Sequence, residues 1–275
     1  TNVYRLPDGA DPASLAEAVR DRILFEGPET VGAVIMEPVQ NAGGCLVPPD
    51  GYWPGLREIA DRYGILLVAD EVICGFGRLG EWLGVTRFGT LPDLVTTAKG
   101  ITSAYAPMGA VIASDKVVAP LYDDPKRTLM HGITFAGHPL CAAISLRNLE
   151  IFEREGVLEN VRALEPYFHR RLDELRALPL VGDVRGAGFF WALELVGEDE
   201  RRLTADEREF LLREHLPPRL LDAGLIARAD DRGDAVLHLA PPLISDREIL
   251  DLLVDRVGTV LAEAGSALTD WRTNA

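Results

Sequence analysis

Four short runs of apolar residues mark the first half of the chain. They cover residues 31–36, 65–69, 94–98 and 109–113. Runs of this length are typical of strands, and the unbroken ones at 31–36 and 65–69 have the pattern of strands buried on both faces of a parallel sheet. The hydrophobic pattern therefore predicts a sheet that starts in the first third of the chain.

Apolar residues at helical spacing lie before and between these runs. One predicted helix begins at Asp11-Pro12, with Asp11 as its N-cap, and stops at Gly27. Another precedes the second strand and ends at Gly64. Both boundaries follow the tendency of proline to open helices and of glycine to close them. Strands that alternate with helices predict parallel βαβ units with right-handed crossovers.

The pattern changes after a long helical stretch at residues 139–154. A second helix follows, and then a strand at residues 189–196 with shorter strands near 225–229 and 236–239. Two capping boxes open further helices, Thr204 with Glu207 and Ser245 with Glu248. We therefore predict an α/β protein in which residues 1–155 form part of a large domain and residues 156–275 form a smaller C-terminal α/β domain.

The charge balance excludes several classes of protein. The 275-residue chain has 28 Lys+Arg against 43 Asp+Glu, a net charge of −15. Such acidity argues against nucleic acid or an anionic membrane surface as a partner. No apolar run reaches the roughly 18 residues of a membrane-spanning helix. Three cysteines without CxxC spacing predict neither a disulfide framework nor a zinc site, and they favour a cytoplasmic protein.

Two charged residues follow neighbouring predicted strands. Asp70 comes after the run at 65–69, and Lys99 after the run at 94–98. Ligands of parallel α/β sheets bind at the carboxyl ends of the strands, so we expect both side chains to face one crevice. An amine and a carboxylate there suit pyridoxal phosphate (PLP), since an amine can attack a carbonyl. A turn-capping aspartate and a solvated lysine would give the same pattern.

Four motifs, in this order, resemble those of the class III aminotransferases, which are PLP enzymes of fold type I. They are Glu37-Pro38-Val39-Gln40 with Gly43-Gly44, Asp70-Glu71-Val72 with Gly75-Phe76-Gly77-Arg78, Thr97-Ala98-Lys99-Gly100, and Thr134-Phe135-Ala136-Gly137-His138-Pro139. The resemblance covers only the later part of the longer family members. We therefore expect a C-terminal portion with an incomplete large domain, a mainly parallel sheet and helices.

The resemblance implies a role for each of these residues. Lys99 would form the Schiff base with PLP and move the proton, and Asp70 would pair with the pyridine nitrogen. Val72 would pack on the ring face. Thr134 would bind the cofactor phosphate of the neighbouring subunit, which implies a homodimer with a shared active site. His138 is interpreted as structural rather than as a general base.

The position of one arginine indicates which subgroup of this family the chain resembles. Ornithine-type relatives carry an arginine shortly before Pro-Pro-Leu, where this chain has His238, and Arg228 occurs earlier instead. This arrangement resembles the ω-amino acid:pyruvate and amine transaminases, in which the arginine binds the acceptor's carboxylate and swings out for an uncharged amine. A surface arginine is the alternative. We therefore expect ping-pong transfer of an amino group from an ω-amino acid or amine to pyruvate or a similar 2-oxo acid.

Other functions remain open on the sequence alone. An aminomutase or racemase could use the same lysine and aspartate, and a non-catalytic fragment would lack the N-terminal half of the site. Gly75, Gly77 and Gly80 satisfy GxGxxG, but neither the helix nor the acidic residue of a dinucleotide site follows. No P-loop, GxSxG or HExxH occurs, and no metal site is predicted.

Overall fold

The computed structural model describes residues 12–124, 126–127 and 129–274. The predicted N-cap Asp11 lies outside these residues. The chain divides into two units, each with a four-stranded sheet among its described residues. The first unit contains Thr1–Pro38, Pro48–Gly77 and Glu81–Glu155, and the second contains Val39–Val47, Arg78–Gly80 and Gly156–Ala275.

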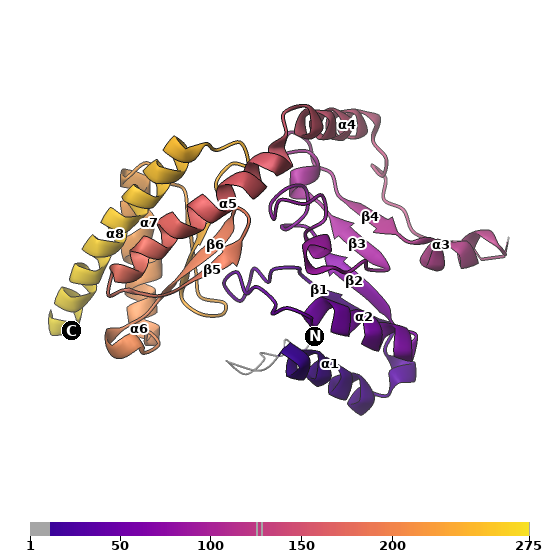
Figure 1. Cartoon of the computed structure of the whole chain (residues 1–275), viewed down its shortest axis with the longest axis horizontal. Coiled ribbons are helices and arrows are strands. Elements are labelled where there is room, and N and C mark those ends of the chain that lie inside the picture. The colour runs from indigo at the N-terminus through magenta and orange to yellow at the C-terminus, as the bar shows by residue number, and fades with distance from the viewer. Residues whose placement is uncertain (1–11, 125, 128, 275) are drawn as a thin grey trace. The chain divides into compact units, whose positions relative to one another are not determined.

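The sheet of the first unit has the order β1-β2-β3-β4 (Figure 1). Its strands are β1 (Ala33–Met36), β2 (Leu66–Asp70), β3 (Leu94–Thr97) and β4 (Ala110–Ala113). The first three are parallel, as predicted, whereas β4 runs antiparallel to β3. Parallel neighbours need a long crossover, usually helical, and only the one-turn helix η3 (Lys99–Ile101) lies between β3 and β4.

Helices α1 (Pro12–Glu26) and α2 (Tyr52–Tyr63) lie side by side near β2 (Figure 1). Gly64 ends α2 with a left-handed φ of 67°, as the sequence predicts. The core here includes Trp53, Leu56 and Leu67. The remaining helices of this unit are η1 (Pro28–Thr30), η2 (Gly84–Phe88), α3 (Asp115–Tyr122) and α4 (Pro139–Arg154).

The outer strands are less buried than their apolar sequences suggest. β2 buries Leu67, Val68 and Ala69, but the side chain of Ile35 in β1 is 59% exposed. The prediction that the run at 31–36 is buried on both faces is therefore wrong. Among the strands that the structure describes, β1 lies at the edge with β2 as its one neighbour, so less protein surrounds its side chains than those of the central strand.

The second unit is built on an antiparallel sheet of order β5-β6-β8-β7. Its strands are β5 (Val181–Ala187), β6 (Phe190–Leu195), β7 (Arg228–Asp230) and β8 (Val236–Leu239). Its helices are α5 (Val157–Asp173), η4 (Glu174–Ala177), η5 (Glu198–Glu200), α6 (Ala205–Arg208), the π-helix η6 (Glu209–His215), α7 (Leu216–Asp222) and α8 (Arg247–Asn274).

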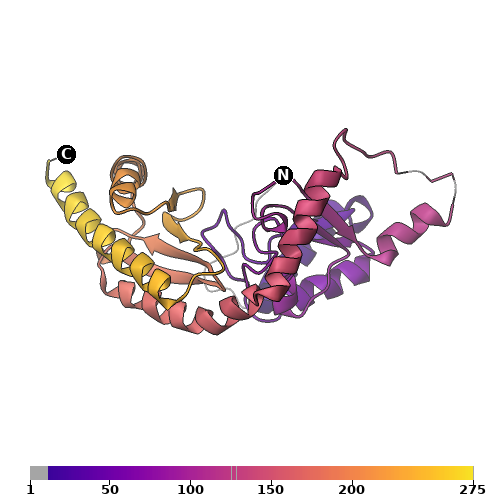
Figure 2. The same cartoon turned by 90° about the horizontal axis from the view of Figure 1, so that it is seen from above.

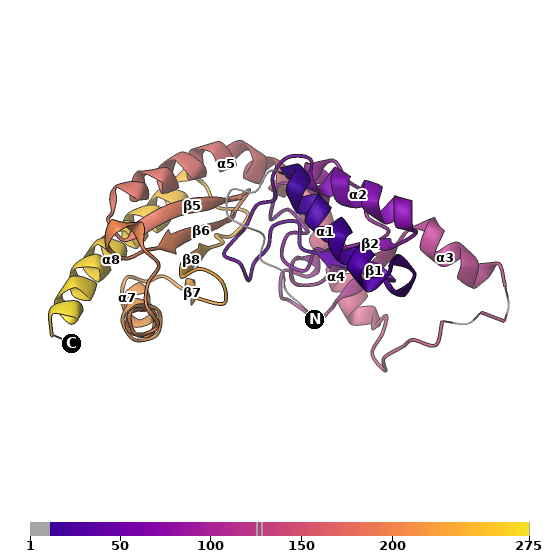
Figure 3. The ribbon, with the colours of Figure 1, turned by 90° about the horizontal axis from the view of Figure 1, so that it is seen from below.

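Figures 2 and 3 show α5 and α8 running side by side along this sheet. In the core of this unit, the ring of Phe168 of α5 packs edge-to-face against the rings of Phe189 and Trp191. The apolar pattern does not predict β5, because its sequence VGDVRGA mixes glycine and charged residues. Neither α8 nor any other helix in the described part of the chain is long and apolar enough to cross a membrane.

The two predicted capping boxes have different outcomes. Thr204 and Glu207 form the reciprocal pair at the start of α6. The prediction of a capping box at Ser245 and Glu248 is wrong. A cap at Ser245 would start the helix at residue 246, but α8 starts at Arg247. Asp246 caps it instead, with its carboxylate accepting the Ile249 N–H at 3.0 Å. Ser245 is buried.

Candidate active site at the strand ends

The candidate site of the first unit lies at the carboxyl ends of β2 and β3. Asp70 is the last residue of β2 and pairs in register with Thr96 of the parallel strand β3. Lys99 follows the end of β3 and opens η3. The fold therefore brings the predicted carboxylate and amine to the same edge of one sheet.

The carboxylate of Asp70 is held by its neighbours through a single oxygen. Its Oδ1 accepts hydrogen bonds from the Thr96 hydroxyl and the Val72 N–H, both at 3.2 Å. Its Oδ2 makes no hydrogen bond to any residue that the structure describes. This leaves one acceptor oxygen available at the sheet edge, next to Val72.

Lys99 has an unusual backbone conformation. Its φ is 41°, in the left-handed region, and Ser103 and Ala104 share this feature with φ of 48° and 65°. That region costs a non-glycine residue roughly 1–2 kcal/mol. Such strain persists only where surrounding structure holds it, and it concentrates at functional sites.

The turn after β3 packs against the turn after β2. A Cβ placed on Gly100 would lie 2.9 Å from the Cβ of Phe76, closer than real Cβ atoms approach. Only glycine fits there, so close packing explains the glycine of the Lys99-Gly100 motif. The contact also fixes the loop that carries Lys99 relative to the loop that follows Asp70.

Glu71 is an important residue of this region that the sequence analysis missed. Its carboxylate is fully buried and accepts the N–H groups of Gly84 at 2.9 Å and Val85 at 2.7 Å. Burial raises the pKa of Glu71 to about 7 despite these two hydrogen bonds, and the charge of Asp70 adds to the rise. Glu71 thus ties the loop after β2 to the start of η2.

Replacing Glu71 with glutamine is expected to flatten the pH dependence of stability. The folded pKa of about 7 exceeds the ordinary 4.5, so the folded chain keeps a proton that the unfolded chain has lost. The free energy of unfolding of the wild type should fall between these pH values, by on the order of 3 kcal/mol from this group.

Urea unfolding at several pH values measures this difference, with Glu58→Gln on the exposed face of α2 as the control. In the control, the free energy of unfolding should change with pH as steeply as in the wild type. In Glu71→Gln, this slope should be smaller. Identical slopes in all three proteins would show that Glu71 does not titrate in this window.

Thr134 and His138 lie just before α4. Thr134 is in an exposed turn, and its predicted contact with a neighbouring subunit's cofactor stays a prediction. His138 is the N-cap of α4, with Nδ1 accepting the Leu140 N–H at 3.3 Å. This contact agrees with the structural interpretation of His138.

In the second unit, Arg228 belongs to a cluster of charged residues on β7 and just after it. Its Nη2 lies 2.5 Å from Oδ2 of Asp230, which also binds Arg232 at 2.7 Å. Burial acts to raise the pKa of Asp230, but the Arg232 hydrogen bonds and the charge of Arg228 outweigh it and lower the pKa to about 2. Half of the Arg228 side chain is exposed, so a carboxylate from solution can reach it.

His238 is the register partner of Arg228 on the adjacent strand β8. Its ring is buried and stacks on Phe190, with ring centroids 6.1 Å apart. Burial is the main cause that lowers the pKa of His238, which favours the neutral ring at neutral pH. The position that holds an arginine in ornithine-type relatives is thus a neutral, packed side chain here.

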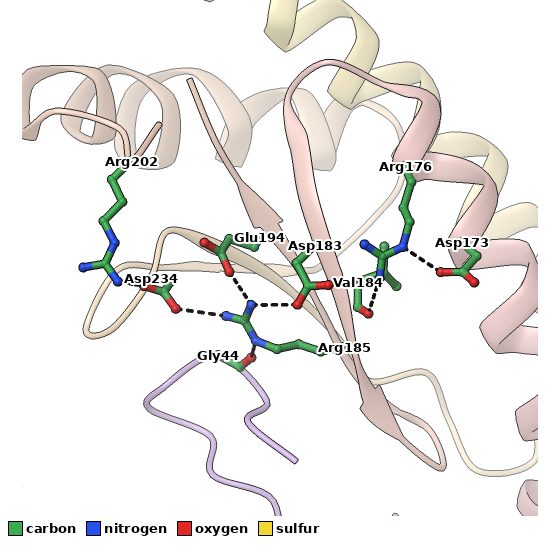
Figure 4. Close-up of polar contacts among 9 residues, drawn as sticks. All are labelled: Gly44, Asp173, Arg176, Asp183, Val184, Arg185, Glu194, Arg202 and Asp234. Atoms are coloured by element: carbon green, nitrogen blue, oxygen red, sulfur yellow. Dashed lines mark hydrogen bonds and ion pairs between the residues drawn. The ribbon is translucent and has the colours of Figure 1, made fainter. Parts of the chain in front are cut away.

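Arg185 of β5 fastens the Val39–Val47 segment to the sheet of the second unit (Figure 4). Its Nε donates to the Gly44 carbonyl at 2.7 Å, and its guanidinium binds the carboxylates of Asp183, Glu194 and Asp234. A Cβ on Gly44 would lie 2.7 Å from a methyl group of Val236. Close packing therefore explains the second glycine of the Gly43-Gly44 motif.

The predicted site residues thus fall into two groups. Asp70, Val72 and Lys99 share one sheet edge and Thr134 precedes α4 in the same unit, whereas Arg228 belongs to the second unit. No group of three or more His, Cys, Asp or Glu side chains within the described ranges is arranged to hold a metal ion.

Comparison with known proteins supports a family assignment. The pattern of the family described as "Aminotransferase class-III" matches residues 5–261. The chain is 47% identical over 271 residues to "Probable aminotransferase Rv3329" of Mycobacterium tuberculosis, covering 96% of this chain and 58% of that protein. It is 44% identical over 256 residues to the putrescine–pyruvate aminotransferase of Pseudomonas aeruginosa, covering 92% of this chain and 54% of the relative.

Solved structures agree with the predicted fold class. An (S)-enantioselective omega-transaminase from Thermomicrobium roseum superimposes with a TM-score of 0.86 at 39% identity, over 95% of this chain and 58% of that one. The chain thus spans somewhat more than half the length of the proteins it matches. Its sequence and its α/β fold together show that it belongs to the class III aminotransferases.

Proposed function

We propose that the chain carries the lysine–aspartate centre of a PLP-dependent transaminase. The donor would be an ω-amino acid or another amine, and the acceptor would be pyruvate or a similar 2-oxo acid. The observation that carries the proposal is the placement of Lys99 and Asp70 at the carboxyl ends of two adjacent parallel strands. The pyruvate-dependent relative of Pseudomonas aeruginosa supports the choice of acceptor.

The residues present fit the functional groups of PLP. The Asp70 Oδ2, which no described residue occupies, suits a protonated pyridine nitrogen. The strained Lys99 supplies an amine at the same sheet edge. When bound, PLP would supply an aldehyde carbon that can hold an amino group between the two substrates, and an electron-withdrawing ring that stabilises the negative charge formed during transfer.

The chain's own side chains would divide the remaining work. Asp70 would keep a negative charge beside the ring nitrogen and so hold its proton in place. Val72 would pack on the ring face, and the Lys99 Nζ would carry the proton between substrate atoms. Thr134 would contact the phosphate bound in a neighbouring subunit of a homodimer. Because the first product leaves before the second substrate binds, the kinetics would be ping-pong.

The proposal is tested by adding PLP to the purified chain, reducing it with borohydride and mapping the adduct by peptide mass spectrometry. Only Lys99, Lys116 and Lys126 can carry a lysine adduct. We expect a visible absorbance band on binding and an adduct mainly on Lys99. A folded chain that shows no band, or an adduct that does not favour Lys99, would contradict the proposal.

The relatives named above are aminotransferases, so aminomutase and racemase chemistry is not proposed.

Replacing Arg228 with alanine is expected to affect the acceptor more than the donor. A guanidinium binds a carboxylate through two parallel hydrogen bonds, so its loss should raise the KM for pyruvate about 10- to 100-fold. The KM for a donor amine without a carboxylate should change little.

Arg232→Ala is the matched control for this measurement, because Arg232 binds the same Asp230 carboxylate as Arg228. Steady-state kinetics of both variants, measured in protein that is active in amino transfer, separate binding of pyruvate by Arg228 from an effect on Asp230. If Arg232→Ala raised the pyruvate KM as much as Arg228→Ala does, the effect would come from Asp230 and not from substrate binding.

A further inference from the structure

One buried side chain of α4 reaches the turn that follows Lys99. The Nδ2 of Asn148 donates to the carbonyls of Gly100 at 2.9 Å and Ile101 at 3.2 Å. Its Oδ1 accepts from the Ser103 hydroxyl at 2.8 Å. Asn148 is only 8% exposed, so these bonds are shielded from water.

The amide of Asn148 has one possible orientation. Two carbonyl oxygens can only accept hydrogen bonds, so the NH₂ group must face them and the oxygen must face Ser103. The NH₂ group thus donates to two carbonyls, and Oδ1 accepts one hydrogen bond. Helix propensity does not favour asparagine in the middle of α4, so tertiary contacts explain its place.

The three contacts of Asn148 enclose the strained segment. Lys99 and Ser103 both have left-handed φ. The two carbonyls that accept hydrogen bonds from Asn148 belong to the residues directly after Lys99. A left-handed lysine relaxes unless the chain beyond it is held. The direction in which the Lys99 side chain leaves the backbone therefore depends on the anchoring of this turn to α4.

We propose that Asn148 is a positioning residue for Lys99. It holds the η3 turn in its helical conformation, so that the Lys99 amine lies at the sheet edge beside Asp70. This inference rests on the proposed function of Lys99 as the amine that bonds to the cofactor. Asn148 itself touches backbone and Ser103, and it acts on the chemistry only through the orientation of Lys99.

The chain offers a matched control. Asn160 of α5 makes the same kind of clamp in the second unit, donating to the carbonyls of Leu243 at 2.8 Å and Ser245 at 3.1 Å. Asn148→Ala and Asn160→Ala each remove two side chain–backbone hydrogen bonds. Only the first removes them next to Lys99, so a general loss of stability would affect both variants alike.

The probe is PLP followed by borohydride. The lysine amine condenses with the aldehyde, water leaves, and borohydride delivers a hydride to the carbon–nitrogen double bond. Lys116, paired with Asp93 at 3.1 Å and half-exposed, serves as the internal reference. We expect the ratio of Lys99 to Lys116 trapping rates to fall about tenfold in Asn148→Ala and to change less than about twofold in Asn160→Ala.

A second variant and a cofactor-free measurement guard against misfolding. Asn148→Asp keeps an acceptor for Ser103 but turns an oxygen toward two carbonyls, so it should lose at least as much trapping. Amide hydrogen exchange of the folded proteins should be faster at residues 99–103 in both Asn148 variants and unchanged there in Asn160→Ala.

The outcomes separate this inference from the function on which it rests. A wild-type chain that shows no preference for Lys99 would refute the proposed function and this inference with it. A wild type that prefers Lys99, with both Asn148 variants retaining that preference, would overturn the positioning role alone.

Discussion

Replacing Lys99 with alanine is expected to abolish the covalent capture of PLP at the sheet edge, leaving only slow trapping on Lys116 and Lys126, and to lower amino transfer by about 10³-fold or more. The variant removes the nucleophile and the proton carrier together. Lys99 is one of three lysines in the chain, and it occupies the end of a parallel strand beside Asp70. No other described lysine lies at that sheet edge, because Lys116 is on α3 and Lys126 follows it.

Two further variants show which property of Lys99 matters. Lys99→Arg keeps the positive charge but cannot lose its proton, so it should fail to the same degree as alanine. Lys116→Ala should leave capture at Lys99 and amino transfer unchanged, since it removes a half-exposed side chain that pairs with Asp93 and Asp61 away from the sheet edge. Absorbance, borohydride trapping and steady-state rates measure these effects. Residual transfer above about a tenth of wild type in Lys99→Ala would exclude Lys99 as the reacting amine.

Replacing Arg185 with methionine is expected to lower the free energy of unfolding by about 3 kcal/mol. Arg185 is the centre of the cluster in Figure 4, and its side chain is only 15% exposed. Without it, the carboxylates of Asp183, Glu194 and Asp234 face one another with less positive charge, and the Gly44 carbonyl loses its donor.

The control for this measurement is Arg202→Met, which lies in the same cluster. Arg202 is 60% exposed and contacts Asp234 at 3.5 Å, so its loss should cost less than about 1 kcal/mol. Urea unfolding of the two variants gives the comparison. Equal destabilisation would mean that burial does not set the contribution of these arginines.

The acid side of the stability curve should change as well. Burial acts to raise the pKa of Asp183, but hydrogen bonds from Arg176 and Arg185 outweigh it and lower the pKa. The wild type therefore gains stability from Asp183 above its ordinary pKa of 3.8 and loses it as the pH falls below that value. Arg185→Met should weaken this loss, because only Arg176 remains to stabilise the charged form.

Elements whose signals are local were predicted well from the sequence. The predicted helix at residues 139–154 matches α4 (Pro139–Arg154), and Gly64 ends α2 as its freedom to adopt positive φ suggests. The capping box at Thr204 formed for the same reason, since both partners lie within one turn. The box at Ser245 failed because the neighbouring Asp246 caps the helix one residue later, with its carboxylate accepting from the Ile249 N–H.

Burial and strand direction were predicted less well. An apolar run reports that a strand has apolar side chains, but the edge position of β1 leaves Ile35 exposed. The antiparallel direction of β4 follows from the short connection after β3, and β5 forms because β6 pairs with it despite its mixed sequence. Each of these outcomes depends on neighbours that a local pattern does not contain.

By itself, the sequence determined the strand-end positions of Asp70 and Lys99, because parallel strands carry their carboxyl ends to one edge wherever they pair. The tertiary structure decided what holds those residues. Asn148 reaches Gly100 across 48 positions, and Arg185 reaches Gly44 across 141. Such contacts leave no periodic signal, since a hydrogen bond between distant residues depends on where packing places two elements and not on their spacing along the chain.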